Sequence, residues 1–187
     1  MLCGVGLCVL FALLFGYFVL ILKANNMLVS LALNTLGSGG TVFMLYALTG
    51  DRGNSTSLAS LQFPTVNIPF IQDIPVLGKI LSGHNVLTYV ALLSVPVMFI
   101  ILMKTPLGLR IRAVGENEGA AESLGTSPVK TRFIALIIAG VFAGFAGMYM
   151  SMGYVSAFTR DMISGRGYIA IAAQNLGGSM PVATFFW

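Results

Sequence analysis

The residues that could carry out chemistry are few in this chain. The single histidine is His84, and the two cysteines, Cys3 and Cys8, lie in one apolar stretch. No Cys/His cluster has the spacing of a metal site, and no G-x-x-x-x-G-K-[ST] phosphate loop is present. Closely spaced carboxylates occur only within residues 116–122, where they form the solvated face of an expected short helix. The sequence therefore predicts no catalytic centre, no metal site and no cofactor of its own.

Composition points to a protein whose exterior is covered by lipid. Hydrophobic residues make up 57% of the 187 positions and charged residues only 9%, whereas soluble domains place charges at about a quarter of their positions. An aqueous surface cannot be built from so few charges. We therefore expect the lipid bilayer to surround this chain, and we expect no nucleic-acid partner.

Four apolar stretches are long enough to cross a hydrocarbon core, which takes about 20 helical residues. None of them contains Asp, Glu, Lys, Arg or His. The first lacks a basic start and is too long for the core of a signal peptide, so it too is interpreted as a span. The predicted spans are residues 1–22, 27–48, 85–103 and 133–153.

A fifth apolar stretch, residues 167–187, carries Gln174, Asn175, Gly177 and Pro181 near its middle. Such a segment can span fully, break, re-enter or pack inside protein, and these alternatives stay open. The chain ends within apolar sequence, so we expect residues 1–187 to be one incomplete transmembrane domain. The fold class expected is all-α and polytopic, with about five membrane segments.

Basic residues in the connecting segments predict the orientation of the spans. Half of the 10 basic residues fall between the third and fourth spans, at Lys104, Arg110, Arg112, Lys130 and Arg132. The loop of residues 104–132 should therefore be cytoplasmic. Alternation then places the loops of residues 49–84 and 154–166 outside.

The same loop has signals for ordered helices. Thr105-Pro106 and Ser127-Pro128 each place a capping hydroxyl before a proline suited to the first helical position. Between them, Asn117 can cap a helix of about two turns that ends at Gly125. Its small apolar face is formed by Ala120, Ala121 and Leu124. Such a helix fits a groove on a partner, although a charged connector that obeys the positive-inside rule remains an alternative.

Glycines predict close helix packing in the fourth span. Gly140 and Gly144 form a GxxxG pair, and Gly147 extends the small surface, so a neighbouring backbone can approach closely.

Polar residues also occur in the middle of the second span. Asn34, Ser38 and Gly39 are expected at membrane depth, where they could line a substrate path or bind a neighbouring helix through polar packing.

Several segments carry a family resemblance. The run KTPLGLRIRAVGENEGAAESLGTSPVKTRFIALIIAGVFAGFAGMYMS resembles the cytoplasmic loop and following helix of ABC-importer permeases of the branched-chain amino acid, ribose and nucleoside group. The segments ANNMLVSLALNTLGSG, IPFIQDIPVLGKIL and GYVSAFTRDMISGRGYIAIAA resemble the nucleoside and simple-sugar branch of that group. Together they cover most of residues 24–173.

The resemblance implies a permease subunit in the plasma (inner) membrane that imports nucleosides or simple sugars and is not itself an enzyme. It implies a second permease subunit, an extracytoplasmic substrate-binding protein, and cytoplasmic ABC ATPase subunits that hydrolyse the ATP. The loop helix would then be the coupling helix that contacts the ATPase. The residues implied in this coupling loop are Arg112, Gly115, Glu116, Asn117, Ala120, Ala121, Leu124 and Gly125.

Two other classes are weighed against this hypothesis. An ion-coupled secondary transporter usually keeps ionisable residues inside its spans, and the four clear spans have none. A non-transporting membrane scaffold would have no need for an ordered helix in the loop of residues 104–132. An ABC-importer permease accounts for both features.

Overall fold

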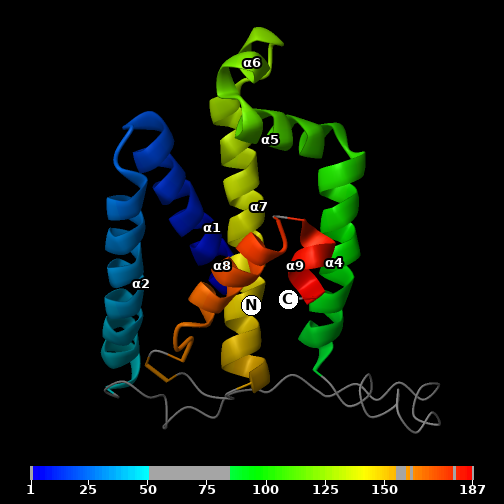
Figure 1. The fold of residues 1–187 in the computed structure, drawn as a ribbon. Helices are drawn as coiled ribbons and strands as arrows, with labels where there is room; N and C mark the ends of the chain where they lie inside the picture. Colours follow the sequence, from blue (N-terminus) through cyan, green and yellow to red (C-terminus); the bar gives the residue numbers. More distant parts are fainter. Residues whose placement is uncertain (1, 51–84, 155–158, 161, 179, 187) are drawn as a thin grey trace, which may run out of the picture.

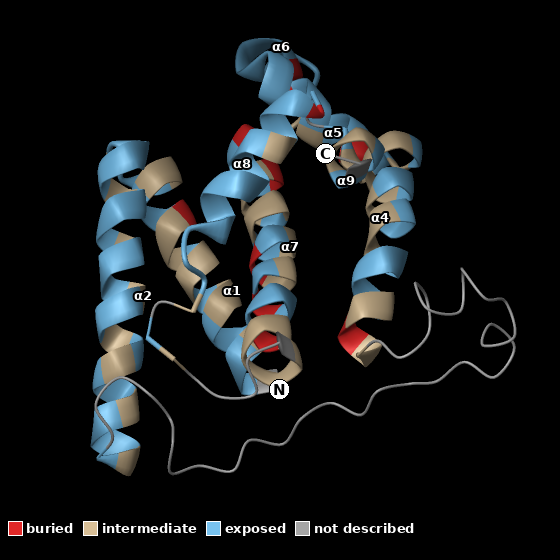
Figure 2. Ribbon diagram, turned by 60° about the horizontal axis from the view of Figure 1, so that its bottom comes forward, coloured by how far each residue is buried: buried red, intermediate tan, exposed pale blue. Residues whose placement is uncertain are grey.

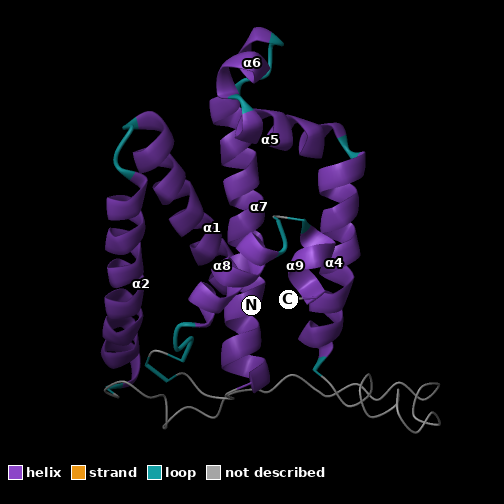
Figure 3. Ribbon diagram, in the orientation of Figure 1, coloured by secondary structure: helices purple, strands orange, loops and turns teal. Residues whose placement is uncertain are grey.

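The described part of the chain is built from helices (Figure 3). The computed structural model describes residues 2–50, 85–154, 159–160, 162–178 and 180–186, and within these ranges it contains no β-strand. The expected all-α, polytopic fold is confirmed. Most of the expected outer loop, residues 51–84, lies outside the described residues.

Four helices are long and apolar enough to cross a membrane, with lengths of 19, 24, 19 and 26 residues. Two of them continue past their α-helical part as a short π-helical segment. The spans of these lengths are Cys3–Ile21, Asn26–Thr49, Val86–Lys104 and Pro128–Gly153. They fall within α1 (Leu2–Gly16) with η1 (Tyr17–Ile21), α2 (Asn26–Thr49), α4 (Val86–Lys104), and α7 (Pro128–Met148) with η2 (Tyr149–Tyr154).

Asparagine side chains begin two of these helices. The Oδ1 atom of Asn25 accepts a hydrogen bond from the N–H of Met27 at 3.0 Å, and Asn85 accepts one from the N–H of Leu87 at 3.4 Å. Each bond satisfies one of the free N–H groups of the first turn. At the other end of α2, Gly50 takes the left-handed conformation with φ of +74°, which suits a residue without Cβ.

Figure 1 shows how the helices are arranged. Helix α7 stands in the middle and packs along α1, while α2 lies at one edge and α4 at the other. A helix of the connecting segment, α5 (Pro106–Glu116), runs across from α4 to α7, and α6 (Glu118–Ser123) stands above it. The turn before α2, which contains Lys23, lies at the same end of the spans as α5 and α6. Both basic connections therefore face the same side.

Few residues of the spans are buried (Figure 2), and many of their large apolar side chains are exposed. On α2, for example, the exposed fraction is 81% for Leu48, 74% for Met27 and 70% for Phe43. Apolar surface on this scale is stable only against lipid or against another protein. The described residues thus form a multi-pass membrane protein.

The stretch of residues 167–187 is divided into two short helices. Helix α8 covers Arg166–Leu176 and helix α9 covers Pro181–Phe186, with 11 and 6 residues, so neither reaches the length of a span. Gly177 and Gly178 separate them, and Gly178 has a φ of +58°. Pro181 then begins the second helix, because its missing N–H costs nothing there. Helix α9 packs against α4 and α8.

Candidate functional site

The segment between α4 and α7 begins with a sharp corner. The Thr105 hydroxyl accepts a hydrogen bond from the N–H of Gly108 at 3.2 Å, and Pro106 occupies the first turn of α5. A Cβ atom at Gly108 would clash with the backbone carbonyl groups of Ile101 and Leu102. The corner therefore requires glycine at this position. Sequence reasoning did not single out Gly108, because a single glycine within a helical pattern does not by itself indicate close backbone approach.

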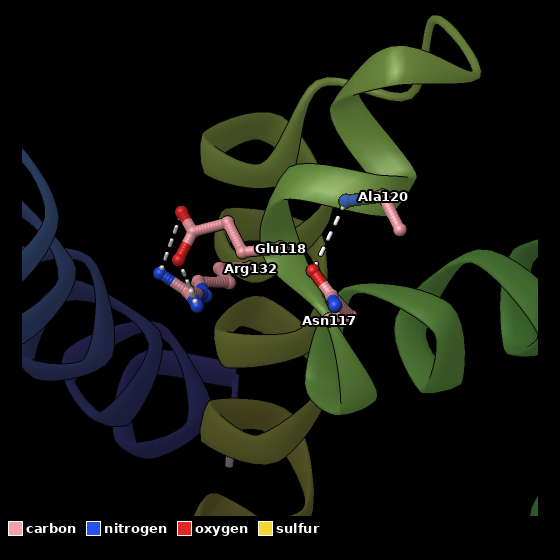
Figure 4. A network of polar contacts seen from close by, with 4 residues as sticks. All are labelled: Asn117, Glu118, Ala120 and Arg132. Atoms are coloured by element: carbon pink, nitrogen blue, oxygen red, sulfur yellow. Dashed lines mark hydrogen bonds and ion pairs between the residues drawn. The ribbon is translucent and has the colours of Figure 1, made fainter.

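Helix α6 is closed at both ends. The Oδ1 atom of Asn117 accepts a hydrogen bond from the N–H of Ala120 at 3.0 Å, as Figure 4 shows. Asn117 itself is extended, with φ of −150° and ψ of 107°, so α5 ends and α6 begins at this residue. At the other end Gly125 has a φ of +79°, and the N–H of Thr126 donates to the carbonyl oxygen of Ala121 at 3.0 Å. This left-handed glycine ends the helix in the usual way.

The small apolar face expected on this helix does not point in one direction. Ala121 is 4% exposed and packs inside the chain, whereas Ala120 is exposed and Leu124 is 85% exposed. Ala121 therefore cannot contact a partner, and the accessible part of the face consists of Ala120 and Leu124. Val114 of α5 and Thr131 of α7 are buried as well, and each lies near the end of a helix that contacts α6.

Gly115 lies inside α5, and no atom lies within 4 Å of the place its Cβ would take. One expected detail of this segment differs in the structure. Ser127 precedes α7 but makes no side-chain capping bond; its carbonyl oxygen accepts bonds from Thr131 instead. The remaining side chains, Arg112 and Glu116, are exposed, and Arg112 contacts the sulfur of Met103 at 3.3 Å.

An ion pair that sequence reasoning missed joins α6 to α7 (Figure 4). The Nη1 and Nη2 atoms of Arg132 donate to Oε1 and Oε2 of Glu118 at 3.1 and 2.7 Å. The two residues are 14 positions apart, and nothing in that spacing indicates contact. Opposite charges near the starts of two consecutive helices are the only signal for this pair in the sequence.

Two glycines of α7 lie against α1, in the most extensive contact between helices of the described fold. A methyl group at Gly140 would lie 2.9 Å from Ala12 Cβ, and one at Gly144 would lie 2.9 Å from Val5 Cα. Distances this short leave no room for a side chain. Gly147 differs, because nothing lies within 4 Å of its position.

The polar residues of α2 are exposed at the edge of the described fold. Asn34, Ser38 and Gly39 all face away from the other described helices, and no atom lies within 4 Å of where a Cβ of Gly39 would be. The Ser38 hydroxyl donates to the carbonyl oxygen of Thr35 at 3.2 Å, within its own helix.

The chain offers no donor set for a metal in the part that the structure describes. No three His, Cys, Asp or Glu side chains come together there. The features with defined geometry are mechanical ones: a capped helix outside the bundle, an ion pair, and a close helix crossing.

The fold and these features define a multi-pass helical membrane protein with an ordered helical segment between two of its spans. The chain matches the family described as the permease component of the branched-chain amino acid transport system over residues 1–186. The chain belongs to this family, and the resemblance seen in the sequence is confirmed.

Several curated proteins are similar to the chain. The guanosine ABC transporter permease protein NupQ of Bacillus subtilis is 36% identical over 185 residues, which are 95% of this chain and 57% of NupQ. The putative glucose ABC transporter permease protein TsgC13 of Haloferax volcanii is 34% identical over 170 residues, 91% of this chain and 50% of that protein.

A third relative is the nucleoside ABC transporter permease protein NupC of Lactococcus lactis, which is 30% identical over 162 residues, 86% of this chain and 50% of NupC. The chain thus spans about half the length of the curated relatives it matches. No solved structure matches it.

Proposed function

We propose that this chain forms the membrane-spanning part of a permease subunit of an ATP-driven ABC importer for nucleosides or simple sugars. Its family and the printed names of its relatives, which include guanosine, nucleoside and glucose transporter permeases, support this function. The structural observation that carries it is helix α6, which is capped at both ends and held outside the spans.

The proposed assembly divides the work between subunits. ABC ATPase subunits bind and hydrolyse ATP, so this chain needs no cofactor. An extracytoplasmic substrate-binding protein delivers the substrate, and a second permease subunit completes the pathway. In this assembly the chain lies in the plasma (inner) membrane with residues 104–132 in the cytoplasm, in agreement with the five basic residues of that segment.

Helix α6 is proposed as the contact with the ATPase. Leu124 at its end is 85% exposed, and Ala120, one turn earlier, is exposed as well. An apolar side chain at the end of a capped helix can insert into a groove on a partner. A movement of the ATPase would then displace α6 relative to the bilayer.

Helix α2 is proposed to contribute to the substrate path. Asn34 and Ser38 are exposed in the middle of a candidate span, where polar groups facing lipid would be costly. Nucleosides and sugars bind through such amide and hydroxyl groups. Polar packing against a further helix is the alternative use of the same residues.

The experiment uses the full-length permease assembled with its ATPase in lipid vesicles. Leu124→Asp should abolish most of the substrate-stimulated ATPase activity and the uptake of labelled nucleosides and pentoses. The matched control is Leu109→Asp, which makes the same change at another exposed leucine. Leu109 is 67% exposed and lies on α5 rather than on α6. Wild-type uptake and stimulation in Leu124→Asp would refute the coupling role of α6. Absence of ATP-dependent uptake of either substrate class by the unmodified assembly would refute the proposed function.

A further inference from the structure

Glu118 and Arg132 make a contact of defined geometry. Two parallel hydrogen bonds of 3.1 and 2.7 Å join the guanidinium group to the carboxylate. Glu118 is the first residue of α6, and Arg132 lies in the second turn of α7. The side chain of Arg132 is 41% exposed and that of Glu118 is 49% exposed. The pair thus ties the loop helix directly to a membrane span.

Such an exposed pair contributes little to the stability of the fold. Its geometry matters more, because a planar guanidinium that binds both carboxylate oxygens fixes the relative direction of the two groups. A single charge contact would hold α6 near α7 and leave it free to rotate. The pair can therefore fix the orientation of α6 relative to α7.

The chain connection at this same end of α6 is of a different kind. Between α5 and α6 the chain passes through the extended residue Asn117, which interrupts the helical hydrogen bonds and permits a change of angle. At the opposite end of α6, the N–H of Thr126 donates to the carbonyl oxygen of Ala121 in the turn that leads to α7. The ion pair therefore adds a second attachment of α6 to α7, at the end of α6 where Asn117 permits a change of angle.

Helix α7 in turn is packed tightly on α1. Gly140 and Gly144 bring the two backbones so close that even a methyl group would clash. A displacement of α7 must therefore move α1 as well, because a close-packed contact does not deform. The ion pair and the glycine contacts thus link α6 through α7 to α1.

We infer that Glu118 and Arg132 are positioning residues that clamp α6 to α7, so that a displacement of α6 by the ATPase is delivered to α7 and α1. This inference rests on the proposed coupling function of α6. It adds the route of the displacement and the two side chains that set it.

The first test exchanges the charges in the full-length permease with its ATPase. Glu118→Arg and Arg132→Glu should each reduce substrate-stimulated ATPase activity about fivefold, since about 1 kcal/mol of lost coupling corresponds to that factor. Basal ATPase activity should stay unchanged. The double variant should recover most of the stimulation, because the pair re-forms in reverse. A double variant no better than the weaker single variant would overturn the clamp.

Two further variants separate geometry from charge. Arg132→Lys keeps the charge but cannot bind both oxygens, so it should lose part of the stimulation; full stimulation would overturn the role of the paired bonds. Lys130→Glu makes the same change in charge two residues away, at an exposed side chain that has no ion pair among the described residues. It should leave stimulation near the wild-type value, and an equal loss there would reduce the effect to net charge.

A structural readout needs no ATPase. In the full-length permease alone, hydrogen exchange of the amides of residues 118–126 should be faster in Glu118→Arg and return to the wild-type rate in the double variant. Equal rates in all three proteins would contradict the clamp.

Failure of the clamp can be distinguished from failure of the proposed function. If Leu124→Asp uncouples the ATPase but the charge exchanges have no effect, only the clamp is overturned. If Leu124→Asp has no effect, the coupling function of α6 itself is overturned.

Discussion

Gly144 of α7 lies against the backbone of Val5 in α1, so close that a methyl group at Gly144 would come within 2.9 Å of the Val5 Cα. Gly140, one turn earlier, faces Val9 in the same way, with 3.0 Å to its Cα. In a bilayer such close backbone approach is a main source of helix association, because lipid removes the hydrophobic drive between spans. The α1–α7 pair therefore depends on these two glycines.

Gly144→Leu should separate α1 from α7. We expect a loss of about 1–3 kcal/mol, the usual effect of overpacking, seen as a lower thermal midpoint of the detergent-solubilised permease. The matched control is Gly147→Leu, one turn along the same helix, where nothing lies within 4 Å. Equal midpoints for the two variants would show that the glycines do not pack as described.

The sequence predicted this contact only in part. The GxxxG spacing indicated a close helix crossing, but it could not name α1 as the neighbour or tell Gly147 from Gly144. Both depend on how α7 is rotated about its axis, which is set by contacts between distant segments. The same limit applies to Ala121 and to the Glu118–Arg132 pair, whose positions depend on the angle between α6 and α7.

Asn117→Ala should loosen α6 without affecting the spans. Loss of the bond to the N–H of Ala120 removes the cap, which costs about 0.5–2 kcal/mol, and a helix of six residues cannot hold its first turn otherwise. Hydrogen exchange of residues 118–123 should become several times faster. Asn117→Ser, which keeps a capping oxygen, should exchange nearly as slowly as the wild type; a rate as fast as in the alanine variant would argue against the cap.

The apolar stretches of the sequence coincide with long helices, because span length is dictated by the thickness of the bilayer. The expected span of residues 27–48 corresponds to α2, Asn26–Thr49, and that of residues 85–103 to α4, Val86–Lys104. The sequence of residues 167–187 does not decide its course, because glycine, proline and amide residues permit several outcomes. The contact of Gly177 with Thr184, where a Cβ would lie 2.6 Å from the Thr184 nitrogen, closes the turn between α8 and α9 and could not be inferred from spacing.

Labelling of single cysteines tests the orientation. In a protein whose native Cys3 and Cys8 are replaced by alanine, Ser123→Cys on α6 and Ser57→Cys in the predicted outer loop should react with an impermeant thiol reagent from opposite sides of the membrane. The reason is that basic residues gather in the segment that contains α5 and α6. Labelling of both from the same side would contradict the predicted topology.

Ala120 and Ala121 are neighbours with opposite environments, and arginine at each position should have a different effect. Ala121 is 4% exposed, so Ala121→Arg must push apart the packed ends of α5, α6 and α7, with a loss of about 1–3 kcal/mol. Ala120 is exposed, so Ala120→Arg should leave the isolated permease as stable as the wild type and weaken only its binding to the ATPase. Thermal midpoints of the permease purified alone, measured beside retention of the ATPase on the immobilised permease, separate the two effects. A permease with Ala121→Arg that is fully stable alone and fails only to retain the ATPase would place Ala121 in the contact surface and reverse the orientation of α6 described above.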